Sequence, residues 1–248
     1  MSEHFIYGIH AVSALLANPQ RRINQLIIHQ DYRTNARLLA IVEQAENKGV
    51  AVRLVNTAYL QQHFVDCVHQ GVIALTDRLP QMNEHHLDGL LQNTNHSFLI
   101  LILDGITDPH NLGACLRTAE AAGVDFVIIP KDKNAQLNAT VAKVACGAAE
   151  VIPLVTVTNL ARVLEKLKKA NVWIYGAAGE ASASLYQLEL KGSVAIVMGA
   201  EGTGLRRLTR THCDALFSIP MNGVVSSLNV SVATGVSLYE VVRQRQKN

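Results

Sequence analysis

The sequence has no apolar run long enough to cross a bilayer, and charged residues make up only 17% of it. The longest apolar runs, such as residues 98–103, stop far short of the roughly 20 residues that a membrane-spanning helix needs. The N-terminal residues show no basic leader and no cleavage-site pattern. We therefore expect a cytoplasmic protein without a membrane segment. Hydrophobic residues make up 49% of the chain, which predicts a folded rather than a disordered protein.

Cysteine is also scarce, and its spacing excludes two common site types. The four cysteines lie far apart without a CxxC motif, which argues against a disulfide framework and a zinc knuckle. Cys115 and Cys146 stand among small and apolar residues, so we expect both to be buried. The ten histidines form no HExxH motif, and the pair at 85–86 lies in a polar stretch typical of a solvated loop. No metal site is expected.

The charge balance is close to neutral. A formal net charge of +2 does not by itself indicate a nucleic-acid-binding protein. Arg206, Arg207 and Arg210 are more informative, because they directly follow a glycine-rich segment. If that segment lines a site, these arginines stand at its rim, where they would attract a phosphate backbone.

The first 78 residues predict a compact α/β unit without a catalytic motif, for which binding or docking is the most economical role. Residues 79–97 mix Pro, Asn, His and Gln and are expected to form a linker. Hydrophobic periodicity places the elements of the first unit as follows: helices near 8–17, 35–47 and 58–63, and strands at 25–29, 50–55 and 71–76.

From residue 98 to 248, apolar strands alternate with helices. Continuous apolar strands between helices are typical of a parallel sheet covered on both faces, so this domain is predicted to be α/β. The expected strands are 98–103, 126–129, 151–157, 173–177, 194–198 and 216–219, and the expected helices are 112–122, 138–146, 160–170 and 228–245.

Three segments of this domain share one arrangement, in which an apolar strand breaks into a small, polar loop and then a helix. The loops are 108–117, 199–205 and 221–231. Loops of this kind gather at the carboxyl ends of the strands of an α/β sheet, where ligands bind. We therefore expect one site that contains the polar side chains of these loops: Asn111, Arg117, Glu201, Ser227 and Asn229.

Each of these residues also has a structural explanation. Asn and Ser near a helix start serve as caps, Arg117 can be a surface arginine, and Glu201 can be a solvated loop acid. The loop GAEGTG has the order G-x-x-G-x-G, not the G-x-G-x-x-G of a dinucleotide fold, which disfavours a nicotinamide-dependent oxidoreductase. A non-catalytic RNA-binding or ribosome-assembly factor remains the alternative, although it would not need three converging loops.

The segments DPHNLGACLRTAEAAGV, IVMGAEGTGLRRL and IPMNGVVSSLNVSVATGVSLYE resemble the three motifs of the SpoU family (SPOUT superfamily) of RNA ribose 2'-O-methyltransferases, in the same order. The leading GIHAV and the rest of the chain are similar to the members that methylate a guanosine ribose in 23S ribosomal RNA. The resemblance implies a catalytic domain that binds S-adenosylmethionine in a deep trefoil knot. It also implies an N-terminal RNA-binding domain of ribosomal-protein type, and a homodimer with sites at its interface.

The resemblance also assigns roles to residues. Backbone groups at Gly199, Ile219 and Leu228 are expected to hold the cofactor, and the catalytic centre is expected to contain Asn111, Arg117, Glu201, Ser227 and Asn229. In the family, the arginine that matches Arg117 is proposed to take the proton of the 2'-hydroxyl. Because arginine stays protonated over the accessible pH range, we instead expect Arg117 to orient the ribose and phosphate. The reaction does not require a metal.

Overall fold

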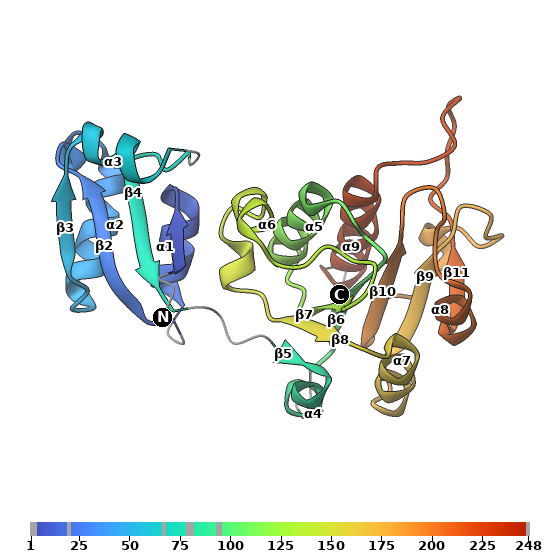
Figure 1. Cartoon of the computed structure of the whole chain (residues 1–248). Coiled ribbons are helices and arrows are strands. Elements are labelled where there is room, and N and C mark those ends of the chain that lie inside the picture. Colours follow the sequence, from blue (N-terminus) through green and yellow to red (C-terminus); the bar gives the residue numbers. More distant parts are fainter. Residues whose placement is uncertain (1–3, 19–20, 66–67, 78–81, 93–95, 247–248) are drawn as a thin grey trace. The chain divides into compact units, whose positions relative to one another are not determined.

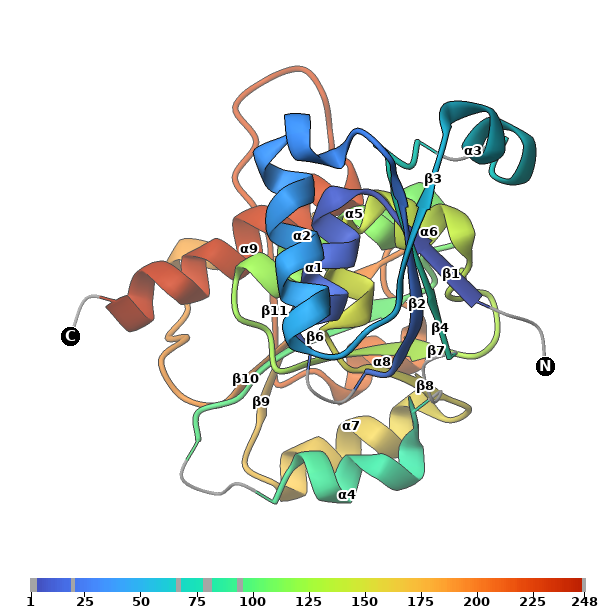
Figure 2. The same cartoon turned by 90° about the vertical axis from the view of Figure 1, so that its left-hand side faces the viewer.

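The computed structural model describes residues 4–18, 21–65, 68–77, 82–92 and 96–246 (Figure 1). Its internal contacts divide the chain into two compact units. Unit 1 comprises residues 1–80 with 146–151, and unit 2 comprises residues 81–145 with 152–248. Each unit has a sheet and a hydrophobic core of its own, and the helices of each can be followed from a second side in Figure 2.

The described strands of unit 1 form a mixed sheet in the order β1-β4-β2-β3. Successive residues of a strand point to opposite faces, and β2 shows this directly. Leu26 and Ile28 join the core beneath α1 and α2, whereas Ile27 packs with Leu60 of α3 on the other face. The elements are β1 (His4–Tyr7), α1 (Ile9–Ala17), β2 (Ile23–His29), η1 (Tyr32–Thr34), α2 (Ala36–Asn47), β3 (Val52–Val55), α3 (Thr57–His63), β4 (Val72–Thr76) and η3 (Ala148–Glu150).

Unit 2 is built on a sheet whose described strands are all parallel, as the sequence predicts. Their order is β11-β9-β10-β6-β7-β8-β5. The central strands β6 and β10 are buried along their whole length, which explains their continuous apolar sequences. The strands are β5 (Met82–Asn83), β6 (Leu99–Asp104), β7 (Phe126–Pro130), β8 (Leu154–Val157), β9 (Trp173–Ala177), β10 (Val194–Gly199) and β11 (Ala215–Phe217).

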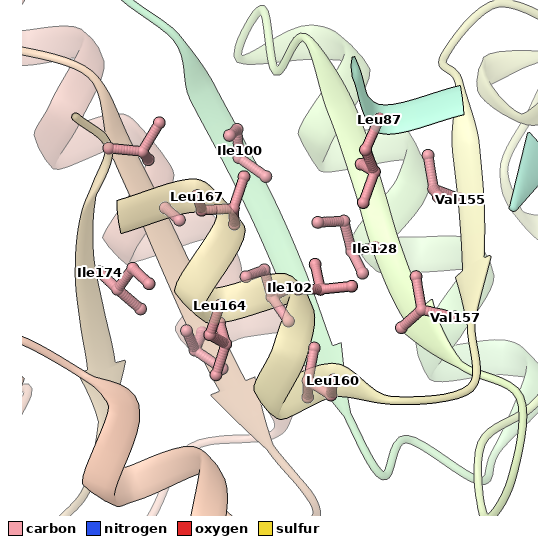
Figure 3. Close-up of a cluster of buried hydrophobic side chains, with 14 of the residues drawn as sticks. Leu87, Ile100, Ile102, Ile128, Val155, Val157, Leu160, Leu164, Leu167 and Ile174 are labelled. Carbon is pink, nitrogen blue, oxygen red and sulfur yellow. The ribbon is translucent and has the colours of Figure 1, made fainter. Parts of the chain in front are cut away.

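Helices cover both faces of this sheet (Figure 1). α5, α6 and α9 pack on one face, and α4 and α7 lie on the other. In Figure 3, Leu160, Leu164 and Leu167 of α7 point onto Ile100, Ile102 and other strand residues. The helices are η2 (Glu84–His86), α4 (Leu87–Leu90), α5 (Pro109–Ala121), α6 (Ala139–Val144), α7 (Leu160–Lys169), η4 (Leu185–Gln187), α8 (Arg207–His212) and α9 (Val230–Gln246).

The segment expected to be a linker has a different structure where it is described. Met82 and Asn83 form β5, which pairs with β8 at the edge of the unit 2 sheet. Leu87 of α4 is fully buried in the core of the same unit. These residues therefore belong to unit 2, because one buried leucine anchors the short polar stretch around it. Residues 79–81 and 93–95 lie outside the described residues.

The expectation for Cys146 is also wrong. Cys115 is buried as predicted, but Cys146 is exposed. The helix expected over 138–146 ends at Val144, because Cys146 and Gly147 have φ of 52° and 97°. An α-helix does not continue through such left-handed residues. β1 and α8, which are short, were not predicted from the sequence. No helix among the described residues is long and apolar enough to span a bilayer.

Candidate functional site

The loops predicted to converge do so at the carboxyl edge of the unit 2 sheet. β6 and β10 are neighbours, and their last residues, Asp104 and Gly199, are register partners. The loop after β6 leads to α5, which begins with Pro109 at its first turn. The side chain of Asp108 accepts a hydrogen bond from the backbone N–H of His110 and caps this helix. This cap sets where the first turn of α5 begins, and Asn111 lies in that turn.

Glu201 lies at the centre of the assembled polar groups. Its Oε1 accepts hydrogen bonds from Asn229 Nδ2 at 2.7 Å, from Asn111 Nδ2 at 3.2 Å and from the backbone N–H of Val230 at 3.3 Å. Asn229 Nδ2 also donates to Asn111 Oδ1 at 2.9 Å. Among the described residues, these bonds to Glu201 all use one carboxylate oxygen. The other oxygen therefore remains available to a ligand.

The position of Glu201 suits its charge. The backbone N–H of Val230 is the first of α9, and a carboxylate at a helix N-terminus is stabilised by the helix dipole. Asn229 contributes to the same helix start, because its Oδ1 accepts from the backbone N–H of Ser231 at 2.9 Å and from its Oγ at 2.6 Å. Capping and site formation thus use the same side chain, so the structural explanation does not compete with the functional one.

A cavity of about 750 Å³ opens beside this cluster. It lies between the loops after β9, β10 and β11 and the start of α9, so it is built from the ends of three adjacent strands. Met198 and Phe217 supply apolar walls. The residues expected to bind a cofactor or catalyse that line it are Gly199, Glu201, Ile219, Ser227, Leu228 and Asn229.

The glycine loop folds back tightly on the strand that it follows. Ala200 and Gly204 exchange backbone hydrogen bonds of 3.1 and 2.9 Å. A Cβ atom at Gly199 would overlap with the carbonyl carbon of Gly204 and the nitrogen of Leu205. Only glycine allows this approach, which turns the loop so that Glu201 faces α5 and α9.

The arginines that follow the loop differ from expectation. Arg206 forms an ion pair with Asp104, and Arg210 forms one with Glu180 at the cavity lining. The hydrogen bond from Arg210 holds the pKa of Glu180 below its usual value. Arg207 is exposed. The prediction that all three stand ready for a phosphate backbone is therefore too simple, because protein carboxylates already engage two of them.

Not every predicted residue joins the cluster. Arg117 is exposed on α5, about 9 Å along the helix from Asn111 at 1.5 Å per residue, and it does not line the cavity. Ser227 lines the cavity, although no hydrogen bond to the Glu201 cluster is seen in the described structure. The loop after β9, whose Gly179 and Glu180 also line the cavity, was not predicted from the sequence to belong to the site. Its small residues and single acid after an apolar strand were the available signal.

The described residues contain no group of three or more His, Cys, Asp and Glu side chains placed to hold a metal ion. This edge offers the carboxylates of Glu201 and Glu180, the second of them paired with Arg210, together with two carboxamides, hydroxyls and backbone groups around a cavity.

Comparison with known proteins gives two family matches along the chain. Residues 98–239 match the SpoU rRNA methylase family, and residues 5–82 match a family described as RNA 2'-O ribose methyltransferase substrate binding. The first match covers most of unit 2 and includes Asn111, Glu201 and Asn229.

Similar proteins extend over nearly the full length. The chain is 56% identical to the 23S rRNA (guanosine-2'-O-)-methyltransferase RlmB of Escherichia coli K12 over 99% of this chain and 100% of that protein. A solved RNA 2'-O ribose methyltransferase is 25% identical, with a TM-score of 0.75 over 98% of this chain and 89% of the other. The fold also matches that of AviRb from Streptomyces viridochromogenes, solved in complex with AdoMet. The TM-score is 0.80 at 21% identity, over 99% of this chain and 92% of the other.

Proposed function

Because the chain belongs to the SpoU rRNA methylase family, we propose that it transfers a methyl group from S-adenosylmethionine to the ribose 2'-hydroxyl of a guanosine in 23S ribosomal RNA. The observation that carries the proposal is the junction of Asn111, Glu201 and Asn229 at the edge of the cavity. This junction brings polar groups from three separate loops to one point. A binding surface alone would not require it.

The cavity fits the cofactor. Its volume of about 750 Å³ lies within the range of pockets that hold small molecules. Gly199, Ile219 and Leu228 line it, and we expect their backbone groups to hold the cofactor, while Met198 and Phe217 supply apolar contact. When bound, S-adenosylmethionine supplies a methyl group on a positively charged sulfur. No metal takes part in the proposed reaction.

The residues of this chain contribute mainly alignment. Holding a hydroxyl in line with its reaction partner can lower a barrier by several kcal/mol. Glu201 holds the carboxamides of Asn111 and Asn229 in place. The donors and acceptors of Asn229 are used within the cluster, whereas Asn111 keeps one N–H and one lone pair that it can present to a ribose at the cavity edge. A hydroxyl is a weak nucleophile until its proton is drawn away, and the second carboxylate oxygen of Glu201 can accept that proton at the cavity lining. Ser227 adds a hydroxyl to the same lining.

Arg117 is proposed to orient the ribose and its phosphate from a second subunit. It is exposed on α5 and outside the cavity lining of its own chain. A homodimer with its sites at the interface would bring this side chain to the partner's cavity. The exposed apolar side chains of Val232 and Tyr239 on α9 support burial of that helix face in a dimer. We expect Arg117→Ala to abolish methylation while S-adenosylmethionine binding survives, and equal loss of both would contradict the assignment.

Mixed dimers test the assignment across subunits. Arg117→Ala and Glu201→Ala subunits, each inactive alone, are combined and assayed for methylation. If Arg117 serves the partner's site, one site of each mixed dimer has both residues intact, and activity returns. If Arg117 serves its own site, every site lacks one residue and the mixture stays inactive. Analytical ultracentrifugation of the parent establishes whether the dimer exists.

Unit 1 is proposed to hold the RNA, which is supported by the match of residues 5–82 to a substrate-binding family. Unit 2 is proposed to carry catalysis and the deep trefoil knot of the SPOUT superfamily, supported by the fold match to AviRb. A cytoplasmic location follows from the proposed ribosomal substrate.

The decisive experiment has two parts. Calorimetry measures S-adenosylmethionine binding to the purified protein, and ribose methylation is mapped in 23S rRNA from cells with and without it. Loss of one methylated guanosine in the deletion strain, restored by the parent protein and not by Glu201→Ala, is the expected result. Unchanged methylation together with RNA binding and no cofactor binding would instead support a non-catalytic RNA-binding or ribosome-assembly factor.

A further inference from the structure

A buried carboxylate lies beneath the glycine loop. Asp104 is the last residue of the central strand β6, and its side chain is 0% exposed. Its Oδ1 has no hydrogen-bond partner in the described structure, and Arg206 Nε lies 3.3 Å away in an ion pair. A buried charge is strongly unfavourable without a partner of opposite charge. The buried charge of Asp104 therefore depends on Arg206 for its compensation.

Arg206 makes contacts on several sides of this position. Its backbone N–H lies 3.3 Å from Asp104 Oδ2, and its Nη2 donates to the carbonyl oxygen of Asp132 at 3.1 Å. Asp132 follows β7, so one arginine connects the loops after β6, β7 and β10. Asn134 of the same β7 loop accepts from the backbone N–H groups of Gly105 at 3.0 Å and Ile106 at 2.7 Å. The three strand ends are thus joined by the ion pair of Arg206 with Asp104 and by the hydrogen bonds of Asp132 and Asn134.

The ion pair lies at the base of the loop that carries Glu201. Arg206 directly follows the segment 199–205, whose ends are joined by the Ala200 and Gly204 hydrogen bonds. Gly199, at the start of the loop, is the register partner of Asp104. A shift of Arg206 would therefore move the C-terminal end of the loop relative to its N-terminal end, and Glu201 lies between them.

We infer that Asp104 and Arg206 form a positioning pair that sets the glycine loop, and through it Glu201 and the cofactor-binding backbone, before any ligand binds. The geometry of the loop does not depend on the proposed function. Only the purpose of the loop, which is to hold the cofactor and Glu201, rests on that function. It gives Arg206 a role different from the phosphate contact expected for the arginine cluster. The side chain of Arg206 is 40% exposed because only its inner edge faces the carboxylate.

Hydrogen exchange of the ligand-free, full-length protein tests the geometry directly. Arg206→Gln leaves the buried carboxylate without its cation, so water must reach Asp104 and the loop must open. We expect the amides of Ala200 and Gly204 to exchange at least tenfold faster. Arg206→Lys keeps a positive charge and should recover part of the protection. Arg207→Gln, which changes the adjacent exposed arginine, should leave the exchange within twofold of the parent.

A second control separates positioning from general destabilisation. Leu167→Ala removes a fully buried side chain of α7 from the core of the same unit and leaves every hydrogen bond and ion pair of the loop in place. It should lower the melting temperature and leave the exchange of the loop unchanged under native conditions. Equal acceleration in Leu167→Ala and Arg206→Gln would overturn the inference, as would exchange within twofold of the parent in Arg206→Gln.

Cofactor affinity links the pair to the site. Calorimetry should show S-adenosylmethionine bound at least tenfold more weakly by Arg206→Gln and by Asp104→Asn. The double variant should bind no more weakly than the worse single one, because the two residues act as one unit. If Asp104→Asn does not fold, Arg206→Gln and Arg206→Lys decide the question. A parent that binds no cofactor contradicts the proposed function, whereas a parent and an Arg206→Gln variant with equal affinity contradict only the positioning pair.

Discussion

Replacing Glu201 by glutamine is the sharpest test of the assembled site. The substitution keeps the size of the side chain and one oxygen that can accept hydrogen bonds, but it removes the charge. In the structure that oxygen, Oε1, accepts from Asn229 at 2.7 Å, from Asn111 at 3.2 Å and from the backbone N–H of Val230 at 3.3 Å. The variant should therefore fold normally, and only the strength that the charge adds to these three hydrogen bonds should be lost.

The expected size follows from the strength of these bonds. A hydrogen bond to a charged group contributes about 1.5–3 kcal/mol and a neutral one about 0.5–1.5 kcal/mol, so each bond loses about 1 kcal/mol. The site is partly open to water and two of the bonds are long, which reduces the total to about 2 kcal/mol. Since about 1.4 kcal/mol corresponds to a tenfold change in rate, kcat/KM for methyl transfer should fall by about 30-fold.

The assay follows methyl transfer to a 23S rRNA fragment under initial-rate conditions, with thermal unfolding measured alongside. The matched control is Glu189→Gln, which removes an exposed acid of the same unit outside the cavity lining. Glu189→Gln should retain the parent kcat/KM. A Glu201→Gln variant within threefold of the parent, or no more impaired than the control, would refute the reasoning that the charge of Glu201 organises the site.

Three further predictions concern the packing around the site. Ile128→Ala removes a fully buried side chain from the core in Figure 3 and should lower the free energy of unfolding by about 2–5 kcal/mol in urea titration; a loss below about 1 kcal/mol would contradict the described packing. Gly199→Ala should weaken S-adenosylmethionine binding at least tenfold because its Cβ overlaps with the loop, whereas Gly89→Ala, with no atom within 4 Å of the added Cβ, should not. Burial raises the pKa of the Cys115 thiol to about 11. Iodoacetamide at pH 8 should therefore modify the exposed Cys146 at least tenfold faster than Cys115, as measured by peptide mapping. Equal rates would show that the two thiols do not differ in access.

The elements of unit 2 were predictable because local chemistry determines them. β6 is apolar up to its last residue, Asp104, and β10 is apolar throughout, which only a strand covered on both faces allows. The helix expected over 112–122 is present as α5, and it begins earlier, at Pro109, because Asp108 caps it and Pro109 suits its first turn. The same reasoning failed for Cys146, because its surroundings in sequence are apolar while its backbone turns out of the helix at a left-handed residue.

The convergence of the loops could be predicted only in outline. Parallel strands carry their loops at one edge, so the sequence indicates that Asn111, Glu201 and Asn229 share a side of the sheet. That they bond to one another depends on the strand order, which makes β6 and β10 neighbours and places β9 next to β10. Strand order is a property of long-range packing and leaves no mark within a single segment, which is why the contribution of Gly179 and Glu180 was missed.

The arginines show the same contrast between what the sequence determines and what the tertiary structure decides. By itself the sequence determined the elements, the class of sheet and the residue types at the strand ends, because each follows from the properties of a short stretch of chain. Only the tertiary structure decided which charges meet. In the sequence Arg206 is one of a basic cluster, but folding brings it to Asp104, 102 residues earlier, where the buried carboxylate would have no compensating charge without it.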